Sequence, residues 1–233
     1  MPDTPPPLES GTLYIVATPI GNLEDITLRA LRVLRECDLV AAEDTRRTRQ
    51  LLRHFEIRKP VVSCHQFNEA KRGVSLMRRL ESGETIALVS DAGTPGISDP
   101  GERLVNDTLA AGHRVEPVPG ACAAIAALSA AGLPMDQFFF GGFPPHKSGQ
   151  RRNWLAAKAM VPGTLVLYES PHRILKLLGE LSISWPECPV VVGRELTKKF
   201  EEFQRGTPSE ILAHMEKSKP RGEFVVLVGE PRI

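Results

Sequence analysis

Residues 85–101 read TIALVSDAGTPGISDPG, an apolar run followed by a loop of glycine, proline, serine and aspartate. A helical pattern over 102–111 follows the loop. A strand, a loop and a helix in this order are the unit of open α/β sheets, which place ligands at the carboxyl ends of their strands. Long loops in compact domains are usually functional. The stretch therefore predicts a ligand site, although ordinary strand-to-helix connections also need glycine and proline.

A second transition of this kind lies near the start of the chain. Residues 13–17 (LYIVA) predict a strand, 18–22 (TPIGN) a turn and 25–36 a helix. Backbone N–H groups are abundant in both loops, and together the loops indicate a bound small molecule with a charged tail.

Strand-like runs alternate with helical patterns along the chain, which predicts parallel or mixed sheets covered by helices. The predicted strands are 13–17, 39–42, 61–64, 85–90, 114–118, 137–141, 164–169, 189–194 and 224–228. The predicted helices are 25–36, 45–55, 71–81, 102–111, 121–131, 151–160, 171–180 and 208–215. Residues 199–205 (KFEEFQR) are a weaker strand candidate, because Phe200 and Phe203 break the alternation of a strand.

A chain of 233 residues is long enough for two small domains. The segment 117–120 (PVPG) ends a predicted strand and precedes an alanine-rich helix. We therefore expect a disordered tail over 1–10, an N-terminal α/β domain over 11–117 and a C-terminal α/β domain over 118–233.

Composition excludes several classes of function. The net charge is +1, so any nucleic-acid site must be a local patch. The four cysteines lie far apart and show no metal-ligand spacing, so we expect buried, reduced thiols and no metal. Neither the dinucleotide fingerprint nor the phosphate loop of ATPases is present. We find no signal peptide and no membrane-spanning run, and expect a cytoplasmic protein.

Eight segments, in order, resemble the ribosomal RNA small subunit methyltransferase I family of the tetrapyrrole methylase superfamily. They are ATPIGNLEDITLRAL (17–31), AAEDTRRTRQLL (41–52), HQFNE (65–69), LVSDAGTPGISDPG (88–101), PVPGACAAIAALSAAGLP (117–134), LYESPHRI (167–174), RELTKKFEE (194–202) and RGEFVVLV (221–228). The resemblance implies two α/β domains with a cofactor cleft between them, and usually a homodimer. It also implies S-adenosylmethionine-dependent 2'-O-methylation of a cytidine in the decoding region of 16S rRNA, within the small ribosomal subunit. Family members usually continue with a small helical segment after the last strand, and this sequence stops at Ile233.

By position in the resemblance, three loops are expected to touch the cofactor. Small residues there let main-chain groups approach a ligand closely. The expected contacts are Pro19, Gly21, Thr94, Pro95, Gly96, Ile97, Cys122 and Ala123. The start of the predicted helix at Ala121 could favour the methionine carboxylate, or the helix could be only a packed core element.

Two segments at the ends of predicted strands are expected to supply catalytic side chains. Glu43 and Arg46 lie where a strand leads into a helix, and Asp44 between them is also a good helix N-cap. Glu169 and Arg173 follow a strand of the second domain, where they could instead form a structural ion pair. A ribose hydroxyl needs its proton removed in the transition state, and the three carboxylates are the candidate bases.

Basic residues gather in two places that could contact RNA phosphates. Arg46, Arg49 and Arg53 share one face of a predicted helix, a pattern that an ordinary solvated face also shows. Lys147, Arg151 and Arg152 form the second group, next to His146. His65, Asn68 and Glu69 match a further family pattern, in which the histidine could be purely structural.

Two other functions fit part of this pattern. A superfamily relative would methylate a small tetrapyrrole or a modified amino acid, and the AEDTRRTR and YESPHR segments disfavour it. A non-catalytic RNA-binding module would lack affinity for the cofactor, which a binding titration would show.

Overall fold

The computed structural model describes residues 6–230, except for the side chains of residues 70 and 71. The chain divides into two compact units, residues 1–122 (unit 1) and 123–233 (unit 2). Each has a five-stranded sheet. Most predicted strands are present within one or two residues of their expected bounds.

Unit 1 is a parallel sheet in the order β3-β2-β4-β1-β5. Its elements are β1 (Thr12–Val16), the 3-10 helix η1 (Leu23–Asp25), α1 (Leu28–Glu36), β2 (Leu39–Ala42), α2 (Thr45–His54), β3 (Val61–Ser63), α3 (Glu69–Glu81), β4 (Ile86–Val89), α4 (Glu102–Ala110) and β5 (Arg114–Val118). Strands β2 and β4 are buried along their whole length, as their unbroken apolar runs predict.

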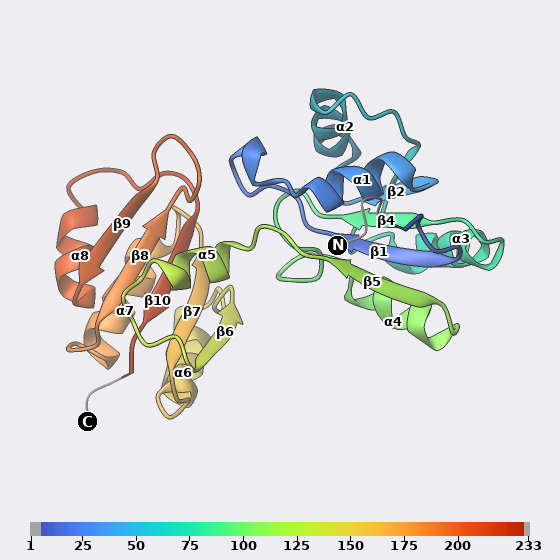
Figure 1. Cartoon of the computed structure of the whole chain (residues 1–233). Coiled ribbons are helices and arrows are strands. Elements are labelled where there is room, and N and C mark those ends of the chain that lie inside the picture. The colour runs from blue at the N-terminus through green and yellow to red at the C-terminus, as the bar shows by residue number, and fades with distance from the viewer. Residues whose placement is uncertain (1–5, 231–233) are drawn as a thin grey trace. The chain divides into compact units, whose positions relative to one another are not determined.

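Alternate side chains of these strands enter two separate cores. Tyr14 faces the core that α1 and α2 cover, whereas Leu13 faces the core that α3 and α4 cover. Figure 1 shows the two helix pairs on opposite faces of this sheet. Such double cover leaves the carboxyl edge of the sheet for the loops that the sequence singles out.

Unit 2 is a mixed sheet in the order β6-β7-β10-β8-β9, in which only the β6–β7 pair is parallel. Its elements are α5 (Ala123–Ser129), β6 (Phe138–Gly142), α6 (Ser148–Lys158), β7 (Thr164–Glu169), α7 (Ile174–Ser184), β8 (Val190–Arg194), β9 (Glu202–Gly206), α8 (Pro208–Met215) and β10 (Phe224–Val228). Leucines of α7 and apolar residues of α8 form its core with Trp185.

Local capping explains why one helix begins later than the sequence predicts. The helix expected over 25–36 begins at Leu28, because the Thr27 side chain accepts a hydrogen bond from the Ala30 N–H group. The helix expected over 171–180 is Ile174–Ser184, and the one expected over 121–131 is only Ala123–Ser129. The weak strand over 199–205 lies at Glu202–Gly206.

The disordered tail expected over 1–10 does not extend to residue 10, because residues 8–10 contact the rest of unit 1. Leu8 packs against the core, the Glu9 N–H group donates to the Tyr14 hydroxyl (2.8 Å), and the Ser10 hydroxyl donates to the Gly83 carbonyl (2.8 Å). Residues 1–5 lie outside the described part of the chain.

The cysteines of the described chain are free, and Cys122 differs from the expected burial because it is only half-buried. Within residues 6–230, no group of three histidine, cysteine or acidic side chains is arranged to hold a metal ion. The same part of the chain contains no helix of the length and apolar character that a membrane crossing requires.

Candidate functional site

Three loops meet at the carboxyl edge of the unit 1 sheet, and we call them the cradle: residues 18–21, 93–97 and 119–122. Thr18 and Gly93 exchange two backbone hydrogen bonds (2.9 and 3.0 Å), and the Thr94 hydroxyl donates to the Ala121 carbonyl (3.2 Å). The connections after β4 and β1 lead to opposite sides of the sheet, so the cradle lies at a topological switch point. Ligands of open α/β sheets bind at such points.

Glycines make this close approach of loops feasible. Gly93 has a φ of +81°, and a Cβ atom there would lie 3.4 Å from Ile20 and 3.7 Å from the Ala121 carbonyl oxygen. A Cβ atom on Gly120 would lie 2.8 Å from the Cβ atom of Ala17, which is too close for two carbon atoms. The cradle therefore presents mainly backbone groups, as the sequence predicts for a ligand-binding loop.

The residues expected to contact the cofactor are distributed among the three loops. Pro19 and Gly21 follow β1, Thr94–Ile97 follow β4, and Cys122 ends unit 1. Ala123 begins α5 in unit 2. The helix expected to start at Ala121 begins at Ala123, and its Ala124 N–H group donates to the Tyr168 hydroxyl (3.1 Å).

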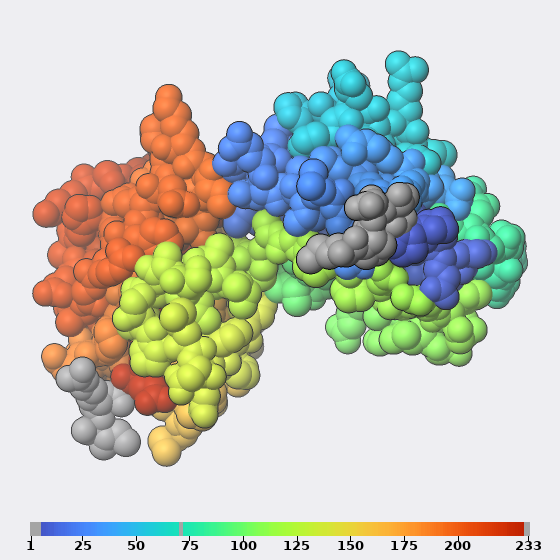
Figure 2. All heavy atoms as spheres, viewed as in Figure 1, coloured from blue at the N-terminus to red at the C-terminus, as the bar shows by residue number. Residues whose placement is uncertain are grey.

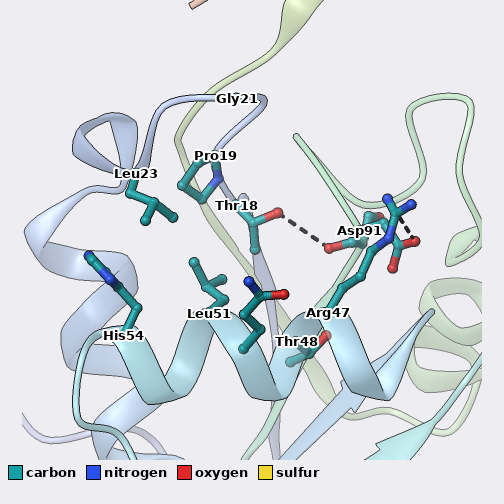
Figure 3. Close-up of a pocket in the computed structure, with 11 residues that line it drawn as sticks. Thr18, Pro19, Gly21, Leu23, Arg47, Thr48, Leu51, His54 and Asp91 are labelled. Carbon is teal, nitrogen blue, oxygen red and sulfur yellow. Dashed lines mark hydrogen bonds and ion pairs between the residues drawn. The ribbon is translucent and has the colours of Figure 1, made fainter. Parts of the chain in front are cut away.

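A pocket of about 280 Å³ adjoins the cradle, between the β1 loop and helix α2 (Figure 3). Pro19 and Gly21 line one side, and Leu51 and His54 of α2 line the other. Arg47 reaches from α2 to Asp91, with 3.5 Å between the guanidinium nitrogen and the carboxylate oxygen.

Carboxylates from β2 and the β4 loop cluster beside the cradle. Glu43 is half-buried, and its Oε2 atom accepts a hydrogen bond from the Asp91 N–H group (3.4 Å). Asp91 in turn accepts from the Asp44 N–H group (3.0 Å). Burial and the negative charge of Glu43 raise the pKa of Asp99 to about 6.

Asp44 has the capping role that the sequence left open. Its side chain accepts hydrogen bonds from the Arg46 N–H group (2.8 Å) and from the Arg46 guanidinium group (2.9 Å). The Arg46 side-chain hydrogen bond lowers the pKa of Asp44 to about 2. Asp44 is thus a poor proton acceptor at neutral pH, which leaves Glu43 as the candidate base at this corner.

Arg46, Arg49 and Arg53 are exposed on α2, whereas Leu52 on the same helix is buried. The side chain of Arg46 is 88% exposed even though it pairs with Asp44. Arg49 makes only long hydrogen bonds, to the Thr45 hydroxyl and the Val61 carbonyl oxygen, both at 3.5 Å. All three guanidinium groups are therefore accessible to a phosphate.

Glu169 and Arg173 form the structural ion pair that the sequence offered as an alternative. The Glu169 side chain has no exposed surface, and its carboxylate accepts from Arg173 (2.9 Å) and from the Ser170 N–H group (2.7 Å). Arg173 also contacts the Pro144 carbonyl oxygen (2.5 Å) and the His146 Nδ1 atom (3.1 Å). Both side chains are engaged inside unit 2, as the structural alternative predicts, and the catalytic roles expected of them stay a prediction.

Arg151 is also placed differently from the expectation of an RNA contact. It is 1% exposed, and its guanidinium group donates to Glu180 at 2.5 and 2.8 Å and to the carbonyls of Pro145 (3.2 Å) and His146 (3.1 Å). Arg151 and Arg173 together hold the loop 143–147 through these hydrogen bonds. Lys147 and Arg152 are exposed, and their contact with RNA stays a prediction.

The RELTKKFEE segment contributes an exposed loop between β8 and β9. Glu195 and Thr197 have positive φ values of 49° and 65°, and Lys198 bridges Glu195 and Glu223 (2.9 and 2.8 Å). Figure 2 shows this loop in orange as a projection from the surface of unit 2. Phe200 at its end is 65% exposed.

Known proteins similar to this chain are methylases. Residues 12–212 match the family model for tetrapyrrole (corrin/porphyrin) methylases. Proteins named ribosomal RNA small subunit methyltransferase I from Pseudomonas aeruginosa and Escherichia coli O157:H7 are each 51% identical. These matches cover 95% and 94% of this chain, and 79% and 77% of the relatives. The chain belongs to the ribosomal RNA small subunit methyltransferase I family.

Solved tetrapyrrole methylase-type structures share the fold of this family member. Diphthine synthase aligns with a TM-score of 0.74 at 16% identity, covering 94% of this chain and 90% of that one. A uroporphyrin-III C-methyltransferase from Thermus thermophilus, complexed with S-adenosylhomocysteine, aligns with a TM-score of 0.66 at 22% identity, covering 94% and 97%. The predicted family and fold class are confirmed.

Two side chains of the candidate site, Asp91 and Asp99, are not singled out from the sequence. Both stand in the loop 90–101, so their position was visible, but their proximity to Glu43 depends on the pairing of β2 with β4. Phe67 stands inside the HQFNE motif (65–69), and nothing in the sequence indicates that its side chain is 86% exposed.

Proposed function

We propose that this chain transfers the methyl group of S-adenosylmethionine to the 2'-oxygen of a cytidine in the decoding region of 16S ribosomal RNA. The observation that supports this most is the identity of about half of the residues with relatives named ribosomal RNA small subunit methyltransferase I, along more than nine-tenths of the chain. The cradle at the switch point supplies the matching ligand site.

The cradle fits a ligand with a nucleoside and an amino acid moiety. Gly120 leaves no room for a side chain, Gly93 has a positive φ that favours glycine, and Gly96 is exposed with no atom within 4 Å of an added Cβ. The backbone of Thr94–Ile97, with Pro19, Gly21 and Cys122, would hold the cofactor. S-adenosylmethionine supplies a methyl group that its sulfonium already activates.

The protein then has to position the ribose and accept a proton. Holding two reactants in line supplies a large part of catalysis, because it removes the entropy of their encounter. Glu43 is the candidate base: it is half-buried next to the cradle, and its one backbone hydrogen bond at 3.4 Å leaves carboxylate capacity for a ribose hydroxyl. Arg46 is exposed beside it and can orient a flanking phosphate.

RNA affinity would come from exposed arginines and lysines. Arg49 and Arg53 extend the Arg46 face along α2, and Lys147 and Arg152 form a second basic surface on unit 2. The assembled small subunit in the cytoplasm is the proposed substrate, and a homodimer the proposed form of the enzyme.

Transfer of label from S-adenosylmethionine to purified small subunits and to free 16S rRNA tests this function. Label on the subunit RNA supports the proposal, and no label on either RNA contradicts it. Calorimetry adds a control for the cofactor: binding of S-adenosylmethionine should persist in the presence of a chelator.

A further inference from the structure

A second cavity of about 520 Å³ opens at the same edge of the unit 1 sheet. It lies beyond the cradle, at the carboxyl ends of β2 and β3 and against the β4 loop. Glu43, His65, Phe67, Ser98 and Asp99 line it together with Gln66 and Pro100. This volume is in the range of small-molecule sites, about 300–1,000 Å³, and its lining combines aromatic with polar groups.

The aromatic wall of the cavity is the exposed ring of Phe67. Phe67 is 86% exposed, which is unusual for a large apolar residue. Its ring meets the His65 ring edge-on, with 6.0 Å between centroids. A free aromatic face of this kind can stack on a nucleobase, an interaction that contributes to RNA binding irrespective of base identity.

Hydrogen bonds hold the turn that carries this ring. The Asn68 side chain accepts from the His65 N–H group (2.8 Å) and donates to the Ser63 hydroxyl (3.2 Å). Buried Glu69 accepts from the Leu104 N–H group of α4 (3.0 Å). His65, Asn68 and Glu69 therefore hold the backbone of the turn that carries Phe67.

Two carboxyl groups, those of Glu43 and Asp99, also line the cavity. Asp99 is half-buried and feels the negative charges of Glu43 and Asp91, and Ser98 before it has a φ of +63°, a backbone conformation rare outside functional loops. A carboxylate accepts a hydrogen bond from the N4 amine of cytosine. Uracil presents an O4 acceptor at that place, which a carboxylate repels.

We propose that this cavity receives the cytosine base of the target nucleotide after it turns out of the RNA, and that Asp99 selects cytosine over uracil while Phe67 stacks on the ring. Glu43 links the two sites, since it lines the cavity and also contacts Asp91 beside the cradle. A base in the cavity thus brings its ribose to Glu43. The inference rests on the proposed function, whose substrate it specifies.

The experiment compares small subunits that carry cytidine or uridine at the methylated position. Wild type should strongly prefer cytidine. Asp99→Asn should lower this preference at least about tenfold, because an amide can turn to donate to uracil O4 or to accept from cytosine N4. Phe67→Ala should raise KM at least about tenfold for both substrates, whereas Phe67→Trp should restore it. Glu102→Gln, an exposed carboxyl change in α4, is the matched control.

A second measurement separates failure of the cavity from failure of the proposed function. Binding of a trinucleotide with a central cytidine or uridine is measured by calorimetry, without any methyl transfer. Cytidine preference that disappears in Asp99→Asn supports the cavity even if no subunit is methylated. An unchanged cytidine preference in Asp99→Asn, in an enzyme that methylates subunits normally, overturns the inference and leaves the proposed function standing. The absence of both methylation and trinucleotide binding by the wild type overturns both.

Discussion

Replacing Arg151 by methionine should destabilise unit 2 strongly, because it leaves a buried carboxylate without its partner. The guanidinium group donates two hydrogen bonds to Glu180 and two to backbone carbonyls, and only the Ser148 hydroxyl (2.6 Å) would remain on Glu180. Breaking a buried ion pair from one side costs about 3–5 kcal/mol. Methionine keeps much of the apolar volume, so the lost charge dominates the effect.

Tryptophan fluorescence during urea unfolding reports the stability of unit 2 separately from that of unit 1. Both tryptophans of the chain, Trp154 and Trp185, belong to the core of unit 2. The unfolding free energy of the Arg151→Met variant should fall by about 3–5 kcal/mol, which is a large part of the stability of a typical domain. Arg152→Met, its exposed neighbour on α6, should stay within about 0.5 kcal/mol of wild type.

A second substitution examines the cause. Adding Glu180→Met to Arg151→Met should recover much of the lost stability, because apolar residues often replace a buried ion pair without loss. If Arg151→Met unfolds within about 1 kcal/mol of wild type, or if the double variant is less stable than the single one, the stranded carboxylate is not the cause. The loop 143–147 would then be held mainly by Arg173.

Three further predictions concern the site. Glu43→Gln should slow methyl transfer in single-turnover kinetics by about 10²–10⁴-fold while calorimetry shows unchanged cofactor affinity; an unchanged rate would exclude Glu43 as the base. Changing Arg49 and Arg53 together to glutamate should weaken RNA binding and flatten its dependence on salt, whereas Arg103→Glu on α4 should leave RNA binding unchanged. An RNA affinity that is unchanged in the double variant would mean that these arginines only form a solvated helix face. The raised pKa of Asp99, about 6 against 3.8, means that ionisation of this group destabilises the fold as the pH rises through that interval. Asp99→Asn should therefore have a higher Tm than wild type at pH 8, and the difference should fade below pH 4; a difference that does not depend on pH would contradict the assignment.

The sheet strands were predictable because their apolar runs are bounded by glycine, proline and charged residues. The switch-point site was predictable for a related reason: loops after parallel strands meet at one edge, so residues 18–21 and 93–97 had to be neighbours once β1 and β4 paired.

Burial of charged side chains was not predictable in the same way. Arg151 is in a basic cluster in the sequence, and its partner Glu180 is 29 residues away on another helix. Glu169 ends strand β7, where the sequence could place it at the surface, yet its side chain is fully buried. Such pairing is decided by tertiary packing, and neither spacing nor periodicity encodes it. A local interaction also changed one helix: the helical pattern begins at residue 25, but the Thr27 cap makes helix α1 begin at Leu28.

Mapping the methylated nucleotide tests the central claim most directly. Small ribosomal subunits lacking the modification are incubated with the protein and labelled S-adenosylmethionine, and the RNA is digested and analysed by mass spectrometry. We expect one methyl group per subunit, on the ribose 2'-oxygen of a cytidine in the decoding region. Label on a base, on another nucleotide or on no RNA, from a protein that binds the cofactor, would contradict it.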